Sequence, residues 1–292
     1  MTPGFGVRAR DLREGVRRLE ALGFRVVLGS HALDRGGYLA GSDEARASDL
    51  SSLINDPGIR AIWFARGGYG SARLLDRIDW SRLTRAPKTL IGYSDVTAIF
   101  AVALARTRSL CLYGPVVTEL ARPEAYHLPS LRRVLRGQEI TLRFAERRVL
   151  VPGRAAGRLL GGNLSVLSHL LGTRHAPRLQ GAILFLEDVG EPAYRLDRML
   201  AHLRMSGALK GVAGVVIGSF EPVSRRSFLE DRPVVELIRE SFEPLGVPVV
   251  IGFPAGHLQG KRTLPLGGRA RLDSRDGKLT IEPRAVAPSR AR

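Results

Sequence analysis

Residues 61–70 read AIWFARGGYG, and residues 89–94 read TLIGYS. Each segment begins with an apolar run of strand length and ends in a turn that contains glycine. Apolar residues at helical spacing surround these runs, at residues 12–22, 45–54, 74–78 and 95–106. Short strands that alternate with helices predict a parallel sheet with helices on both faces. Ligands bind such sheets at the carboxyl ends of the strands, where both glycine turns lie.

The rest of the chain predicts a second domain. Further strands are expected at residues 24–28 and 109–113, before the pattern becomes polar and arginine-rich at about residues 122–153, with one helix at 130–135. Strands then follow at residues 182–186, 212–217, 248–251 and between 264 and 281, with helices near 164–171, 194–205 and 234–242. We predict an N-terminal parallel-sheet α/β domain at residues 1–125 and a linker region at 126–153. A smaller mixed α/β domain is predicted at 154–292, with the active site in the interdomain cleft.

The composition is that of a globular enzyme. The 292 residues are 44% hydrophobic and 25% charged, which excludes an intrinsically disordered chain. The single cysteine, Cys111, excludes an internal disulfide and a multi-cysteine metal site. The longest apolar runs are strand-sized, and residues 1–13 lack the apolar core of a signal peptide. These features predict a cytoplasmic protein with no membrane partner.

The charge balance is strongly basic, with 45 Lys and Arg against 28 Asp and Glu and a net charge of +17. Binding to nucleic acid favours clustered basic residues with aromatic side chains between them. Here the arginines are single or paired and aromatic residues make up only 6% of the chain. We therefore predict no nucleic-acid partner, although the positive field would attract an anionic substrate.

Ser94 is the hydroxyl best placed for chemistry. It follows a predicted strand and precedes a predicted helix, where backbone amides stabilise the oxyanion of an acyl transfer. The motif is not G-x-S-x-G, because Val96 occupies the position of the second glycine. Serine is also a favoured helix N-cap, and this alternative stays open from the local pattern.

Three other features could contribute to a site. The glycines of Arg66-Gly67-Gly68-Tyr69-Gly70 can bring N–H groups close to a substrate, or simply form a βα turn. Their spacing matches no phosphate-binding motif, so we predict no nucleotide cofactor. Glu187 follows a buried strand and could orient a histidine, or complement a helix dipole. His257, in a loop after the strand at 248–251, could act as a base or be merely exposed.

Ser94, Glu187 and His257 together form the set of groups that a serine hydrolase uses. Each of them follows a predicted strand, and the wide spacing requires the two domains to meet. No pair of histidines has the spacing of a zinc site beside a suitable carboxylate, so we predict no metal.

Five ordered motifs resemble those of the LD-carboxypeptidases, the serine peptidase family of murein tetrapeptide carboxypeptidases and microcin C immunity hydrolases. They are Arg66-Gly67-Gly68-Tyr69-Gly70, Gly92-Tyr93-Ser94-Asp95, Gly161-Gly162-Asn163-Leu164, Leu186-Glu187-Asp188-Val189-Gly190-Glu191 and Pro254-Ala255-Gly256-His257. The resemblance extends from the helix near residue 12 to the segment at residues 264–267. It implies a homodimer with the site between an N-terminal α/β domain and a smaller C-terminal domain.

The resemblance also assigns roles. It implies that Ser94 is the nucleophile, Glu187 the orienting acid and His257 the general base. The oxyanion hole would consist of the backbone amides of Asp95 and Gly68. The implied reaction releases the terminal D-alanine of a murein tetrapeptide in cytoplasmic cell-wall recycling, without a metal or cofactor.

The free carboxylate of such a substrate needs a partner, for which a guanidinium is well suited. Arg66 is our candidate, with an ordinary surface or salt-bridged arginine as the alternative. We also expect Gly67 and Asn163 to contribute to substrate binding.

Two alternatives to this function are considered. One is an immunity-type hydrolase of a peptidyl-nucleotide, and the other is a non-catalytic relative that binds nucleic acid. The chain also departs from the family pattern in two places. Residues 1–10 supply no apolar first strand, so either the sheet lacks one or the start was assigned late. The segment Leu258-Gln259-Gly260-Lys261 stands where the family commonly has a small residue and then an asparagine, and we expect Lys261 and Arg262 to influence the choice of substrate.

Overall fold

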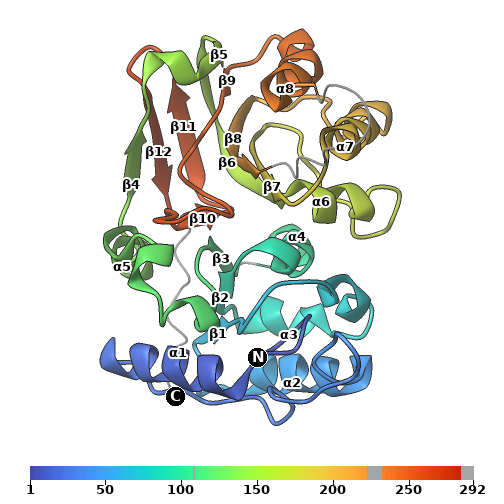
Figure 1. Cartoon of the computed structure of the whole chain (residues 1–292), viewed down its shortest axis with the longest axis vertical. Helices are drawn as coiled ribbons and strands as arrows, with labels where there is room; N and C mark the ends of the chain where they lie inside the picture. The colour runs from blue at the N-terminus through green and yellow to red at the C-terminus, as the bar shows by residue number, and fades with distance from the viewer. Residues whose placement is uncertain (108, 222–231, 284–292) are drawn as a thin grey trace.

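The computed structural model describes residues 1–107, 109–221 and 232–283, and these residues form two stacked parts (Figure 1). The N-terminal part contains α1 (Ala9–Ala21), α2 (Asp43–Asn55), β1 (Ala61–Trp63), α3 (Trp80–Arg85), β2 (Thr89–Gly92), α4 (Thr97–Arg106) and β3 (Leu110–Tyr113). Strands β1, β2 and β3 are parallel neighbours, as the alternation of strands and helices predicts.

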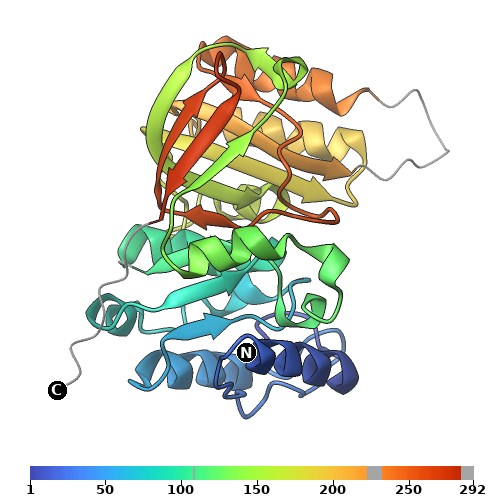
Figure 2. The ribbon, with the colours of Figure 1, turned by 90° about the vertical axis from the view of Figure 1, so that its left-hand side faces the viewer.

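The C-terminal part contains a sheet of eight strands. Their order is β4-β12-β11-β6-β7-β8-β9-β5, and the neighbouring pairs from β6 to β9 are parallel. Figure 2 shows this sheet above the N-terminal elements. Its strands are β4 (Ile140–Arg143), β5 (Val149–Val151), β6 (Arg154–Asn163), β7 (Ala182–Val189), β8 (Gly214–Glu221), β9 (Val249–Val250), β11 (Arg269–Asp273) and β12 (Lys278–Glu282). The helices of this part are α5 (Leu128–Leu135), α6 (Leu164–Leu170), α7 (Ala193–Met205) and α8 (Val234–Phe242).

One strand crosses between the two parts. β10 (Leu264–Leu266) pairs antiparallel with β3 and so completes the N-terminal sheet. The sequence pattern indicates a strand here but not its partner. The segment that leads into β10 carries His257, so this crossing holds a C-terminal histidine against the N-terminal sheet.

Helix α4 follows Ser94 and lies where the two parts meet. It contacts α6 and β6 of the C-terminal part, and every residue from Thr97 to Leu104 is buried. A helix that is apolar on all sides is stable only when it is covered on all sides, and the buried stretch AIFAVAL at residues 98–104 meets that condition. The carboxyl end of β2 is therefore held against the second sheet.

Several expectations for local structure need correction or completion. Residues 24–28 form no strand, and Phe24, Val27 and Leu28 are 38–48% exposed. An apolar run forms a strand only where a neighbouring strand can share its backbone hydrogen bonds. Near the end of β1, the amide of Ala65 donates instead to the carbonyl of Met1. No strand precedes α1 within the described residues.

The helix expected at residues 74–78 is only a 3-10 turn at Ser71–Leu74. The chain turns again before α3, because the Asp79 side chain caps the new helix through the amide of Ser81. In the segment at residues 126–153, β4 and β5 join the eight-stranded sheet. Among the described residues, no helix has the length and apolar character needed to cross a membrane.

Candidate active site

Ser94 occupies a strained turn at the end of β2. Its φ is +66°, the one positive value at a non-glycine residue in the described part of the chain. Such a conformation costs about 1–3 kcal/mol and is typical of nucleophile elbows. The Ser94 side chain caps no helix, so the N-cap alternative is wrong. Ser94 therefore holds a strained conformation directly after the carboxyl end of β2.

The glycine turn approaches Ser94 directly. A Cβ added to Gly67 would lie 3.0 Å from Ser94 Cβ and 3.2 Å from Ser94 Oγ. Gly68 has a φ of +104°, and the ring of Phe5 fills the space that its side chain would need. Only glycine fits both positions, so this backbone borders the Ser94 hydroxyl.

Glu187 lies near the end of β7 with none of its surface exposed. Its Oε2 accepts hydrogen bonds from His257 Nδ1 at 2.7 Å and from the His257 amide at 3.1 Å. Its Oε1 accepts from the Tyr113 hydroxyl at 2.6 Å and from Asn163 Nδ2 at 3.3 Å. Burying a carboxylate is costly unless donors surround it, and here four donors do so.

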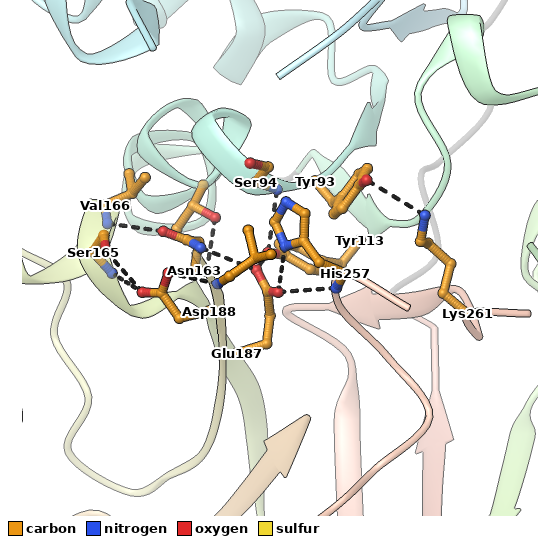
Figure 3. A network of polar contacts seen from close by, with 12 residues as sticks. Tyr93, Ser94, Tyr113, Asn163, Ser165, Val166, Glu187, Asp188, His257 and Lys261 are labelled. Atoms are coloured by element: carbon orange, nitrogen blue, oxygen red, sulfur yellow. Dashed lines mark hydrogen bonds and ion pairs between the residues drawn. The ribbon is translucent and has the colours of Figure 1, made fainter. Parts of the chain in front are cut away.

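His257 lies between Glu187 and Ser94 (Figure 3). Because Glu187 accepts the proton on Nδ1, the lone pair is left on Nε2, which faces Ser94 in the figure. The ring of His257 contacts the ring of Tyr93 at 4.7 Å between centroids, and 18% of the side chain is exposed. With Nδ1 bound to Glu187, Nε2 is the ring nitrogen on the side of Ser94, as in the pair of a serine hydrolase.

The predicted oxyanion donors lie on two sides of Ser94. Asp95 directly follows it in the chain, and its buried carboxylate accepts from the amide of Ser71 at 2.9 Å. Burial raises the pKa of Asp95 above its ordinary value. Gly68 belongs to the turn that touches Ser94. The location of these amides is compatible with an oxyanion hole, which stays a prediction.

The expected substrate-binding residues occupy different surroundings. Arg66 is exposed; its guanidinium donates to the carbonyl of Gly6 at 3.2 Å and lies over the ring of Phe5. Asn163 is buried and fully engaged: its Nδ2 donates to Glu187, and its Oδ1 caps α6 through the amide of Val166. Their roles in binding substrate stay predictions, and Asn163 has a second role as a donor to Glu187.

Lys261, which we expected to influence the choice of substrate, is buried. Its side chain is 5% exposed, and Nζ lies 2.7 Å from Glu119 Oε1 and 4.5 Å above the ring of Tyr93. The hydroxyl of Tyr93 also donates to Glu119 at 2.7 Å. This buried cluster lies behind Tyr93, on which His257 packs.

Sequence reasoning missed Tyr93, Tyr113 and Glu119. A signal for Tyr113 was present, because it ends the strand next to the strand of Ser94. None existed for Glu119, whose partner Lys261 is 142 positions away. Within the ranges that the structure covers, no group of three His, Cys, Asp or Glu could hold a metal ion.

Comparison with known families now identifies the chain. Residues 1–114 match the LD-carboxypeptidase N-terminal domain, and residues 156–272 match the LD-carboxypeptidase C-terminal domain. The chain belongs to the LD-carboxypeptidase family. It is therefore a serine-type carboxypeptidase, and the predictions of family and of enzyme class are confirmed.

The relatives of this LD-carboxypeptidase family member agree with that assignment. The murein tetrapeptide carboxypeptidase of Pseudomonas aeruginosa is 34% identical over 290 residues, which cover 94% of this chain and 92% of the relative. The crystal structure of muramoyltetrapeptide carboxypeptidase from Oxalobacter formigenes matches with a TM-score of 0.83 at 31% identity, covering 96% of each chain. An MccF-like protein from Bacillus anthracis matches with a TM-score of 0.85 at 27% identity, covering 97% of this chain and 95% of the other. These matches confirm the predicted two-domain α/β fold.

Proposed function

We propose that this peptidase removes the C-terminal D-alanine of a murein tetrapeptide, with Ser94 as nucleophile, His257 as general base and Glu187 as orienting acid. One observation carries the proposal: Glu187 holds His257 Nδ1 at 2.7 Å, with Nε2 turned toward the strained Ser94 (Figure 3). The names of the relatives in Pseudomonas and Oxalobacter support this substrate class.

The reaction follows from this geometry in two stages. Ser94 Oγ attacks the carbonyl carbon of the bond between an L-centre and D-alanine, while His257 Nε2 takes the hydroxyl proton. The negative charge that develops on the carbonyl oxygen faces the amides of Asp95 and Gly68. His257 then protonates the leaving amine, and a water molecule, activated by the same base, hydrolyses the acyl-enzyme.

Glu187 supports both stages without exchanging its own proton. It fixes the tautomer and orientation of His257, and its charge stabilises the imidazolium that forms. Arg66, with its exposed guanidinium, is our candidate partner for the free carboxylate of the substrate. The net charge of +17 favours the approach of such an anionic peptide.

The test is mass spectrometry of the purified protein after incubation with murein tetrapeptide, in parallel with its Ser94→Ala variant. Loss of one alanine by the wild type alone supports both the reaction and the nucleophile. A wild type that leaves the tetrapeptide intact but cleaves a peptidyl-nucleotide would replace this proposal with the immunity-type alternative. Salt-dependent binding of random duplex DNA without hydrolysis would instead favour the non-catalytic relative.

We also propose that the enzyme works as a homodimer in the cytoplasm, as the family resemblance implies. Light scattering coupled to size-exclusion chromatography measures the mass of the particle. A mass near twice that of the 31.8 kDa chain supports the dimer.

A further inference from the structure

Tyr113 lies at the centre of the site but in neither the predicted triad nor the oxyanion hole. It ends β3, where Gly92 of β2 pairs with it on one side and Leu264 of β10 on the other. Its side chain is 1% exposed. The ring packs edge-on against Phe185 of β7 at 5.3 Å between centroids, so it already reaches the second sheet.

The hydroxyl of Tyr113 joins two parts of the catalytic machinery. It accepts a hydrogen bond from the backbone amide of Ser94 at 3.2 Å. It donates to Glu187 Oε1 at 2.6 Å. Burial, and then the charge of Glu187, raise the pKa of Tyr113 well above its usual range, so the phenol keeps the proton that it donates.

We propose that Tyr113 is a positioning residue for the hydrolysis, whose hydroxyl holds the strained turn of Ser94 in register with the Glu187–His257 pair. This inference rests on the proposed serine hydrolysis. Ser94 follows β2 of the first sheet, Glu187 lies in β7 of the second, and Tyr113 bonds to both. Because the amide of Ser94 is already engaged, the oxyanion must be bound by other amides, in agreement with the prediction for Asp95.

The bond to Glu187 also has an electrostatic consequence. The two oxygens share one negative charge: Oε2 faces His257 and Oε1 faces Tyr113. A strong donor on Oε1 draws charge away from Oε2 and so weakens its hold on a protonated imidazole. Removing the Tyr113 hydroxyl therefore makes His257 easier to protonate, a change that loss of packing alone would not produce.

The test compares Tyr113→Phe with Tyr93→Phe. Both remove a buried phenol hydroxyl next to the site, but the hydroxyl of Tyr93 bonds to Glu119 and not to Glu187. We expect Tyr113→Phe to lower kcat about 10- to 100-fold with KM within about twofold of wild type, because the hydroxyl positions groups and does not bind substrate. The acidic limb of its kcat/KM profile should move to higher pH by roughly half a unit.

A second measurement does not depend on the substrate. NMR titration of the ring proton of His257, assigned by its loss in His257→Gln, should show a higher midpoint in Tyr113→Phe and an unchanged midpoint in Tyr93→Phe. If wild type cleaves no murein peptide but the midpoint moves only in Tyr113→Phe, the positioning role holds and the proposed substrate fails. The inference is overturned if a folded Tyr113→Phe variant changes neither the His257 midpoint nor kcat. It is also overturned if Tyr113→Phe and Tyr93→Phe shift the midpoint equally.

A second substitution at position 113 tests the same hydrogen bond if Tyr113→Phe does not fold. Replacing Tyr113 with 3-fluorotyrosine keeps the ring and the hydroxyl but makes the phenol a stronger donor. The His257 midpoint should then move to lower pH, opposite to the shift in Tyr113→Phe. A shift to higher pH would contradict the proposed bond to Glu187.

Discussion

Gly256 lies so close to Glu187 that a Cβ built on it would be 2.7 Å from Oε2 of the carboxylate and 2.8 Å from its Cβ. This approach lets the next residue, His257, place both its amide and its ring nitrogen on the same oxygen. The glycine of the Pro254-Ala255-Gly256-His257 motif is therefore required for the close packing of His257 on Glu187, which leads to the first prediction.

Gly256→Ala should abolish most activity and lower the free energy of unfolding. Its φ of +109° disfavours any side chain, and the new methyl would collide with Glu187 and with Ser219 Oγ. Gly172→Ala is the matched control, because Gly172 also has positive φ but nothing within 4 Å of an added Cβ. The control should lose about 1–2 kcal/mol from backbone strain alone. Equal losses of activity and stability in the two variants would contradict the packing argument.

Ser94→Ala should remove nearly all turnover while the chain stays folded. Loss of a nucleophile in a serine triad lowers kcat by about 10⁴ to 10⁶. Steady-state assays on murein tetrapeptide measure the loss, and thermal unfolding checks the fold. Ser52→Ala, on the exposed face of α2, is the control and should behave as wild type. A folded Ser94→Ala variant with wild-type turnover would remove Ser94 from the mechanism.

Asp95→Asn should become more stable relative to wild type as pH rises. Burial raises the pKa of Asp95 in the folded state, so the folded chain binds this proton more tightly than the unfolded chain does. The stability of wild type then falls as pH rises from the ordinary pKa of 3.8 to the raised one, while asparagine has no charge to bury. Urea unfolding at several values between about pH 4 and about pH 7 measures the difference.

Asp43→Asn provides the control of opposite sign. Hydrogen bonding from Arg73 is the main cause that lowers the pKa of Asp43. Wild type should therefore gain stability over this variant as pH rises from the lowered pKa to the ordinary value of 3.8, and the difference should stay constant between about pH 4 and about pH 7. Parallel pH profiles for the two variants would show that burial does not govern Asp95.

Lys261→Met should destabilise the fold without changing the preferred substrate. The variant leaves the buried Glu119 without its ammonium partner, and breaking a buried pair costs about 3–5 kcal/mol. Adding Glu119→Gln should recover part of the loss, which a double-mutant cycle measures. Lys278→Met is the control, since its pair with Asp276 is well exposed and should matter little. A stable Lys261→Met enzyme with altered preference between murein tetrapeptide and peptidyl-nucleotide would show instead that Lys261 influences the choice of substrate.

Much of the site could be predicted from local patterns. Ser94 and His257 follow strands and Glu187 lies near the end of one, and the apolar residues of these strands are plain in the sequence. Side chains at the ends of parallel strands are well placed to form a site. The parallel core β1-β2-β3 and the buried α4 also follow from the spacing and length of apolar runs. In contrast, residues 24–28 show that an apolar run does not itself specify a strand, because pairing depends on what lies beside it.

The amino-acid sequence alone therefore determined the class of the fold and made Ser94, Glu187 and His257 the candidate reactive groups, because both inferences depend on periodicity and on the chemistry of single side chains. Only the tertiary structure decided that β10 pairs with β3, that Lys261 is sealed against Glu119, and that Tyr113 joins Ser94 to Glu187. Each of these contacts links distant parts of the chain, and a local pattern contains no information about which distant partner a side chain meets. The physical reason is that burial and hydrogen-bond geometry depend on how the whole chain packs, with His257 between the two sheets.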